Sequence, residues 1–275
     1  MNFPTAPTTR PRARTRIART TLAAVLLACC THAALADQLD EIKKAGKVRV
    51  AIAIGTPLFS YTDANLQPTG SDVDTATELA KDLGVKLEIV PVSTAARIPT
   101  LQAQRVDLVI SALSVTEDRA KVVDFSIPYS AITIMVAAPK DVTITGYADL
   151  AGKRIGLTRA TTNDQLTTKE AKGAEIMRYE DDATLITSVA TGQVDIFSST
   201  PSNLGEINKR APGKNFELKF SQLDSGLGIT MSKGEPKLKE WINGWVLTNL
   251  KNGKLNAIYK KYHGRDLPGD IVKAG

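Results

Sequence analysis

Residues 106–119 read VDLVISALSVTEDR, and this stretch decides the fold. Its first part, Val106 to Ile110, is a short apolar run of the kind that forms a buried strand. Its second part is polar and leads into a short helix after Thr116. In α/β sheets, ligands bind beyond the carboxyl ends of the strands, where helices begin. The stretch therefore predicts an α/β protein that binds a ligand where this strand gives way to the helix.

The polar part of this stretch offers the groups that a carboxylate ligand needs. Ser111 and Ser114 provide hydroxyls, and the helix start provides free backbone N–H groups. Arg119 provides a guanidinium whose fork matches the two oxygens of a carboxylate. A purely structural interpretation stays open, in which Thr116 caps the helix and Arg119 pairs with a nearby acid.

Strands and helices alternate outward from this stretch in two series. In the first series we expect strands at 48–54, 87–92 and 106–110, and helices at 72–83, 97–104 and after Thr116. The long apolar segment 131–138 crosses to a second series, with strands at 154–157, 175–179 and 194–197, and helices at 164–171, 183–190 and 202–209. Strands at 216–220 and 227–231 and two further helices complete the chain. This alternation predicts α/β sheets with helices on both faces, arranged in two lobes.

The second series contains another hydroxyl-rich helix start. Thr161 and Thr162 follow an expected strand and precede an expected helix. Two threonines at a helix N-terminus can help to hold an anion, because the helix dipole is positive there. Ordinary N-capping explains the same residues equally well.

Residues 1–36 are predicted to be a secretory signal peptide. They contain five arginines and no acidic residue, then an apolar run from Leu22 to Cys30 that is too short to span a bilayer. A small-residue cleavage site ends at Ala36, so the mature chain is expected to begin at Asp37 and to reside in the periplasm. Residues 26–29 also resemble a lipoprotein cleavage box, so a lipid anchor at Cys29 is the alternative that we favour less.

Removal of the leader changes what the composition means. The net charge falls from +6 to about +1, so the basic charge belongs to targeting and indicates no nucleic-acid partner. Both cysteines leave with the leader, so the mature chain has no thiol for a disulfide, a metal site or a nucleophile.

The motifs of common enzyme classes are missing from the mature sequence. It has no Gly-rich phosphate loop, metal-ligand cluster or nucleophile elbow. Its one histidine, His263, is near the C-terminus and is expected to be a solvated side chain. These features argue against hydrolase, kinase and dehydrogenase functions, and no cofactor, metal or catalytic residue is expected.

Six segments in order resemble the family 3 extracellular solute-binding proteins, the polar amino-acid receptors of ABC transporters. They are 57–61 (PLFSY), 70–74 (GSDVD), 106–111 (VDLVIS), 123–129 (VDFSIPY), 152–156 (GKRIG) and 192–195 (GQVD). The resemblance implies a two-lobe periplasmic binding protein fold, type II-like, with a two-strand hinge and a ligand cleft between the lobes. On this basis we expect one lobe from 37–134 plus 230–275 and the other from 135–229.

The resemblance also implies roles for individual residues. Arg119 matches the arginine that clamps the ligand carboxylate, and Ser114 matches the small hydroxyl residue beside it. Ser111 matches a first-lobe residue whose backbone meets the ligand, and Thr162 matches the second-lobe threonine at a helix start. Arg97 resembles an arginine that receptors for acidic amino acids direct at the side-chain carboxylate, although a solvated helix residue is an equal alternative.

Three further residues complete the expected ligand site. Phe59, in the first quoted segment, and Thr161 are expected to contact the ligand. Thr200 occupies the position five residues after Asp195, where many relatives have an aspartate that pairs with the ligand ammonium. A hydroxyl there can accept a hydrogen bond but supplies no negative charge.

The departure at Thr200 leaves the ligand's ammonium group without an assigned partner. Ala53 and Thr56, near positions where relatives can have charged or aromatic residues, are neutral and small. Either Asp181 or Asp182 takes the ammonium, or the ligand lacks an α-ammonium. Both acids are at an expected helix start, where capping is the more common role.

The sequence thus predicts a receptor that binds an amino acid or a related small carboxylate and delivers it to an ABC transporter permease in the inner membrane. We expect it to be a monomer with no activity of its own. The alternative is a periplasmic enzyme on the same scaffold, similar to cyclohexadienyl dehydratases. Such an enzyme needs a proton donor or acceptor in its cleft.

Overall fold

The computed structural model describes Met1 and residues 37–273. Apart from Met1, the expected signal peptide (residues 1–36), including the alternative lipid anchor at Cys29, lies outside the described residues. Helix α1 (Gln38–Ala45) follows Asp37, whose carboxylate caps it by accepting from the backbone N–H of Leu39 at 3.0 Å. The residue that we expect to begin the mature chain is therefore the N-cap of the first described helix.

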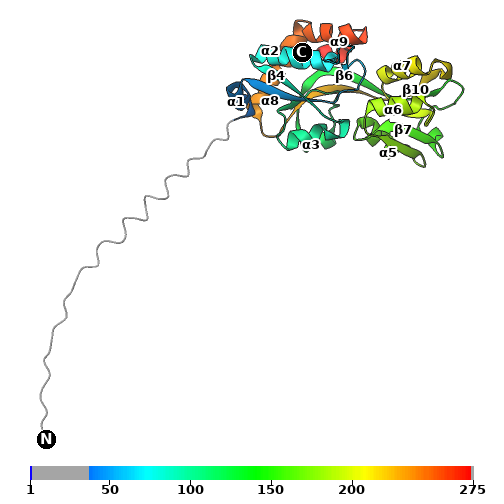
Figure 1. Cartoon of the computed structure of the whole chain (residues 1–275), viewed down its shortest axis with the longest axis horizontal. Coiled ribbons are helices and arrows are strands. Elements are labelled where there is room, and N and C mark those ends of the chain that lie inside the picture. The colour runs from blue at the N-terminus through cyan, green and yellow to red at the C-terminus, as the bar shows by residue number, and fades with distance from the viewer. Residues whose placement is uncertain (2–36, 274–275) are drawn as a thin grey trace. The chain divides into compact units, whose positions relative to one another are not determined.

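A mixed sheet of eight strands runs through the described part of the chain in the order β4-β1-β5-β10-β6-β9-β7-β8 (Figure 1). In the first lobe, β1 (Lys47–Ile52) pairs in parallel with β4 (Lys86–Pro91) and β5 (Leu108–Val109). Figure 1 shows α2 and α9 on one face of these strands and α3 on the other. The helices of this lobe after α1 are α2 (Ser71–Leu83), α3 (Arg97–Gln102), α4 (Glu117–Ala120), α8 (Pro236–Lys251), α9 (Lys254–His263) and α10 (Gly269–Lys273).

The second lobe repeats this construction. Its strand β7 (Arg154–Thr158) pairs in parallel with β8 (Glu175–Tyr179) and β9 (Ile196–Ser199). Parallel neighbours require crossover connections, which helices provide. The helices are α5 (Thr162–Glu170), α6 (Asp182–Ala190) and α7 (Pro201–Arg210). The fold is the expected α/β architecture.

Two long antiparallel strands connect the lobes. Strand β6 (Asp124–Pro139) pairs with β10 (Phe216–Met231) along their whole lengths, from Phe216 beside Pro139 to Met231 beside Asp124. Strand β6 also pairs with β9 of the second lobe, and β10 pairs with β5 of the first. Each strand is therefore shared by both lobes, and any movement of one lobe relative to the other must bend or twist this pair of strands.

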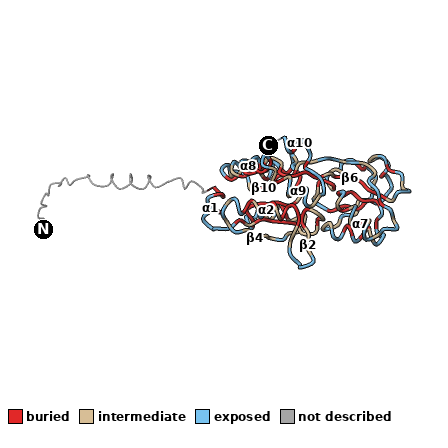
Figure 2. Tube along the Cα trace, turned by 90° about the horizontal axis from the view of Figure 1, so that it is seen from above, coloured by how far each residue is buried: buried red, intermediate tan, exposed pale blue. Residues whose placement is uncertain are grey.

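The apolar cores separate along these shared strands. On β6, Ile134 packs in the first-lobe core and Met135 in a second-lobe core. On β10, Leu227 and Ile229 pack with the first lobe, so the change of core comes before the expected boundary at 229/230. Figure 2 shows the buried residues along α2 and the strands, with exposed residues on the outer turns.

The structure joins two segments that the sequence separated. The expected strands at 216–220 and 227–231 form one strand, β10, with register shifts at several points. The intervening residues are mostly polar, which conceals the continuous pairing with β6. At Gly226 an added Cβ would lie 2.8 Å from the ring of Pro128, so this position of the pair requires a glycine.

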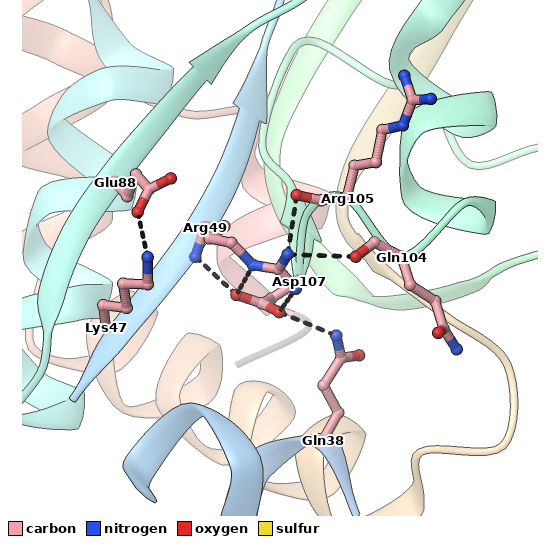
Figure 3. A network of polar contacts seen from close by, with 7 residues as sticks. All are labelled: Gln38, Lys47, Arg49, Glu88, Gln104, Arg105 and Asp107. Carbon is pink, nitrogen blue, oxygen red and sulfur yellow. Dashed lines mark hydrogen bonds and ion pairs between the residues drawn. The ribbon is translucent and has the colours of Figure 1, made fainter. Parts of the chain in front are cut away.

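Two of the quoted family segments have structural roles. Gly70 begins α2 with φ +128°, and an added Cβ would lie 2.2 Å from the carbonyl oxygen of Phe59. Asp107 accepts from the backbone N–H and from Nη2 of Arg49, both at 2.7 Å, and from Nε2 of Gln38 at 3.2 Å (Figure 3). The buried Asp107 carboxylate thus ties α1 and β1 to the start of β5.

The expectation that His263 is solvated is wrong. Its ring stacks on Tyr259 with centroids 4.0 Å apart and meets the edge of Phe59 at 4.6 Å. Nε2 lies 3.2 Å from Oγ of Ser71. Burial, with a smaller contribution from Arg265, lowers the pKa of His263 to about 4, so the ring is neutral at pH 7. The histidine joins α9 to α2 through Ser71 and to the loop before α2 through Phe59, contacts that the sequence pattern does not reveal.

Within the described residues, no helix combines the length and apolar character needed to cross a membrane.

Candidate ligand-binding site

A polar cavity lies between the two lobes, with an empty volume of about 500 Å³ including the space at its open edge. Both lobes and the shared strand β6 contribute to its wall. The lining residues are Thr56, Thr94, Arg97, Ala112, Ser114, Arg119, Ile132, Ile134, Thr158, Thr161, Thr162, Asn163, Asp182, Ser198, Ser199 and Thr200.

Arg119 is held at the cavity by main-chain and hydroxyl acceptors. Its side chain is buried, and Nη1 donates to the carbonyl of Ser114 (2.9 Å) and to Oγ1 of Thr162 (3.1 Å). Nη2 donates to the carbonyl of Ala160 at 3.3 Å. Thr116 caps α4 as expected, but no acid of the described residues forms an ion pair with Arg119. The second half of the structural interpretation, pairing with a nearby acid, therefore does not hold.

The charge of Arg119 is retained in spite of its burial. Desolvation, with a smaller contribution from the charge of Arg97, lowers the pKa of Arg119 to about 9. The guanidinium is still protonated at pH 7. A buried cation without a counter-ion is costly, and an anionic ligand would offset that cost.

Arg97 is a second buried guanidinium on the same wall. Its Nε donates to the carbonyl of Thr94 (2.8 Å), and Nη1 donates to the carbonyls of Ser111 (2.7 Å) and Ala112 (3.4 Å). Burial lowers the pKa of Arg97 to about 10, which the negative charges of Asp182 and Asp72 partly oppose. The solvated-helix alternative is therefore wrong, because the side chain turns inward to bind these carbonyls. In the described chain, Nη2 has no hydrogen-bond partner.

A buried carboxylate behind the wall shapes the loop that Arg97 binds. Asp72 is fully buried and accepts from the hydroxyl of Tyr129 (2.7 Å) and from the backbone N–H of Ala112 (2.8 Å). Ala112 has φ +44°, a left-handed conformation that costs an alanine about 1 kcal/mol or more. Burial raises the pKa of Asp72 to about 7. The sequence reasoning missed this residue, although Asp72 belongs to the quoted segment 70–74.

Three helices of the second lobe begin at the cavity. Thr161 caps α5 by accepting from the backbone N–H of Asp164, and Thr200 caps α7 by accepting from that of Asn203. Asp182 is the first residue of α6 and also lines the cavity. The positive ends of three helix dipoles therefore converge there, which favours an anion.

Asn163 is a cavity residue that the sequence reasoning did not select. Its Nδ2 donates to Oγ of Ser198 (3.1 Å) and to the carbonyl of Ser199 (3.2 Å). Because a carbonyl only accepts, Nδ2 must be the atom that faces Ser199, and the amide orientation is fixed. The available signal was its place directly after Thr161 and Thr162 at a helix start.

Asp182 and Asp181 have different surroundings despite being neighbours in the sequence. Asp181 caps α6, and its Oδ1 accepts from the backbone N–H of Thr184 at 2.8 Å. Asp182 faces the cavity, where Oδ2 accepts from Oγ1 of Thr56 (2.9 Å) and Oδ1 from Oγ1 of Thr158 (2.6 Å). Of the two acids that the sequence left open, the structure brings only Asp182 to the cavity.

Residues 48–265 match the model of the bacterial extracellular solute-binding proteins, family 3. The chain belongs to this family. This solute-binding protein is 28% identical to the L-cystine-binding protein TcyJ of Escherichia coli (strain K12) over 256 residues, covering 90% of this chain and 94% of TcyJ. The resemblance inferred from the sequence is confirmed.

Solved structures of amino-acid-binding proteins have the same fold. A variant of ArgBP from T. maritima matches with a TM-score of 0.76 at 29% identity, covering 82% of this chain and 99% of that chain. The ancestral amino acid-binding protein AncCDT-1, a precursor of cyclohexadienyl dehydratase, matches with a TM-score of 0.73 at 31% identity and the same coverage. The two-lobe fold expected from the sequence is confirmed.

Most residues predicted for the site of this solute-binding protein line its cavity. They are Arg97, Ser114, Arg119, Thr161, Thr162 and Thr200. Ser111, whose backbone was expected to meet the ligand, does not: its carbonyl accepts from Nη1 of Arg97 at 2.7 Å, and its buried Oγ accepts from the backbone N–H of Ala53 at 2.8 Å. Phe59 does not either, because its ring packs in the first-lobe core against His263.

Proposed function

We propose that this solute-binding protein captures an amino acid or a related small carboxylate between its lobes and delivers it to an ABC transporter permease in the inner membrane. The single observation that supports this most is the buried guanidinium of Arg119, which faces a polar cavity without an acidic partner among the described residues. The L-cystine-binding protein TcyJ and ArgBP, which has been solved in an arginine-bound form, support the ligand class by similarity.

In this proposal Arg119 binds the ligand carboxylate together with hydroxyls from both lobes. Ser114 and Thr162 flank the guanidinium, one from each lobe. Each N–H···O bond from a guanidinium to a carboxylate is roughly twice as strong as a hydrogen bond between neutral groups. A cavity that excludes water strengthens both bonds further. A ligand held in this way contacts both lobes, and so its binding favours the closed arrangement.

Arg97 is proposed to meet the side chain of the ligand. Three carbonyl oxygens fix its orientation, and Nη2 is left for a further acceptor. The charged groups on the cavity wall are Arg97, Arg119 and Asp182, which together carry one net positive charge. Amino acids with an acidic or carbonyl-bearing side chain are therefore the first ligands to test.

The enzyme alternative has less support. AncCDT-1 makes it worth testing, because that binding protein preceded a dehydratase. A dehydratase needs a group that moves a proton inside the cleft. No histidine is found on the cavity wall within residues 37–273, and the one acid among the lining residues, Asp182, is held in place by two hydroxyl hydrogen bonds. We therefore favour binding without turnover.

A thermal-shift screen with the purified mature protein tests the function. Amino acids, keto acids and dicarboxylates are added one at a time, and hits are measured by isothermal titration calorimetry. A ligand present at one hundred times its dissociation constant adds about 2.7 kcal/mol to the free energy of unfolding, which raises the melting temperature visibly. Mass spectrometry of the recovered ligand checks for turnover. Absence of any shift, or conversion of the ligand, would contradict the proposal.

Two further parts of the proposal concern the state of the protein in the cell. We propose that the leader is cleaved after Ala36 and that the mature protein is a periplasmic monomer. The intact mass of the exported protein tests the cleavage, and a diacylglyceryl group on Cys29 would contradict it. Light scattering coupled to gel filtration measures the oligomeric state.

A further inference from the structure

We propose that Asp182 is the counter-ion for the ammonium group of the ligand, and that Thr56 links this contact to the closure of the lobes. This inference rests on the proposed function as an amino-acid receptor. It assigns the ammonium to the start of α6, and Thr200 at the start of α7 is left with a supporting role.

The carboxylate of Asp182 is held in place at the cavity wall and has acceptor positions left for a cation. Each carboxylate oxygen accepts one hydroxyl hydrogen bond, from Thr56 at 2.9 Å and from Thr158 at 2.6 Å. A carboxylate has about four acceptor positions, so both oxygens keep one for a further donor. Thr56 and Thr158 are themselves buried, which fixes the carboxylate at the cavity wall.

The charges on the wall leave one place for an ammonium. Arg97 and Arg119 repel a cation, and Asp182 is the single acid among the lining residues. The dipole of α6 places roughly half a positive charge near Asp182, which stabilises the carboxylate but does not cancel its full negative charge. Thr200 also begins a helix but has no such charge, and its hydroxyl already contacts Ser202 at 2.9 Å.

Thr56 connects this site to the other lobe. It lies in the loop after β1, where its backbone N–H donates to the carbonyl of Ser60 at 2.9 Å. Asp182 and Thr158 belong to the second lobe. The Thr56–Asp182 hydrogen bond therefore exists only when the lobes are together, and an ammonium bound to Asp182 sits beside this contact. A ligand without the ammonium leaves a partly buried carboxylate without its cation and should close the protein less well.

Matched ligands and matched variants test the assignment. L-Glutamate, L-glutamine, L-arginine, L-histidine and L-cystine are each compared by calorimetry with the same acid lacking its α-amino groups. The proteins are wild type, Asp182→Asn, Thr56→Val and Asp181→Asn. Asp181→Asn is the control, because Asp181 caps the same helix and does not line the cavity. Circular dichroism and thermal unfolding check the fold of each variant.

We expect wild type to bind at least one amino acid about 30-fold or more tightly than its deaminated analogue, as for a buried charge pair. Asp182→Asn should lose about that factor for the amino acid and change the analogue by less than about threefold. Thr56→Val should show a smaller loss, and Asp181→Asn should bind both ligands as wild type does.

The outcomes separate this inference from the proposed function. Equal losses for both ligands in Asp182→Asn would show a structural role and overturn the inference. An unchanged amino-acid affinity in that variant, or wild-type preference for a deaminated analogue, would overturn it as well while leaving a carboxylate receptor. If neither the amino acids nor their analogues bind wild type, the proposed function itself fails. If Asp182→Asn misfolds, the affinities of wild type for each amino acid and for its deaminated analogue decide the question.

Discussion

Arg119→Ala removes the group on which the proposed ligand contact depends. The Arg119 residue is 5% exposed in the wild type, and no carboxylate of the described residues pairs with its guanidinium. Loss of one member of a buried charge pair typically costs about 2–5 kcal/mol in binding. At 25 °C this equals about 30-fold to several thousand-fold in dissociation constant. The Ala variant also loses the hydrogen bond to Thr162 that joins the lobes, so the effect should fall in the upper part of this range.

The same substitution should change the stability of the ligand-free protein little, although it weakens ligand binding strongly. Burial lowers the pKa of Arg119 from its ordinary value to about 9, so the folded state disfavours the charged group. Removing that group relieves the desolvation cost and offsets the lost packing. We therefore expect the ligand-free Ala variant to melt close to the wild-type temperature, while the ligand-induced shift disappears.

Calorimetry with the ligand from the screen, together with thermal unfolding, measures both effects. Arg119→Lys should recover binding in part, because an ammonium keeps the charge but lacks the planar fork. Arg159→Ala is the control, since this side chain is 52% exposed and pairs with Glu180 at 2.8 Å. It should bind within about twofold of wild type. If Arg119→Ala binds within about threefold of wild type, the carboxylate is bound elsewhere and the site is misassigned.

Two other predictions concern stability and are tested by urea unfolding. Asp107→Asn should lower the free energy of unfolding by about 1–3 kcal/mol, because it leaves the partly buried Arg49 without its carboxylate. The control is Glu88→Gln, which breaks the exposed pair with Lys47 in the same region (Figure 3) and should cost less than about 1 kcal/mol. Equal losses would contradict this. The pKa of Asp72 is about 7 in the folded state, above the ordinary value of 3.8, so the folded state binds its proton more tightly than the unfolded state. Stability should therefore fall as pH rises from 4 to 7, by about 4 kcal/mol at most. Asp72→Asn should flatten this dependence, and parallel pH curves for the variant and wild type would show that Asp72 is ionised throughout.

The alternation of strands and helices was predictable because it is recorded locally. Apolar periodicity and helix-start residues depend on neighbours within a few positions, and they indicated both α/β series and the crossing at 131–138. Arg119, Ser114 and Thr162 were found for the same reason, since each lies at or near a strand end or a helix start. The pairing of β10 with β6 was only half visible, because its middle consists of polar residues whose partners are about ninety positions away.

The sequence by itself determined the family, the two-lobe class and six of the cavity-lining residues, whereas the tertiary structure decided which other side chains face the cavity. Asp181 and Asp182 are equivalent in sequence, but Asp181 is the N-cap of α6 with an extended backbone, and its carboxylate accepts from the backbone N–H of Thr184, whereas Asp182 is the first helical residue. Only Asp182 meets Thr56, which arrives from the other lobe. In the same way Ser111 is used by a neighbouring strand, and Phe59 turns into the core against His263. A side chain can bind a ligand only where a segment distant in sequence forms the opposite wall of the cavity. The local sequence contains no information about that contact.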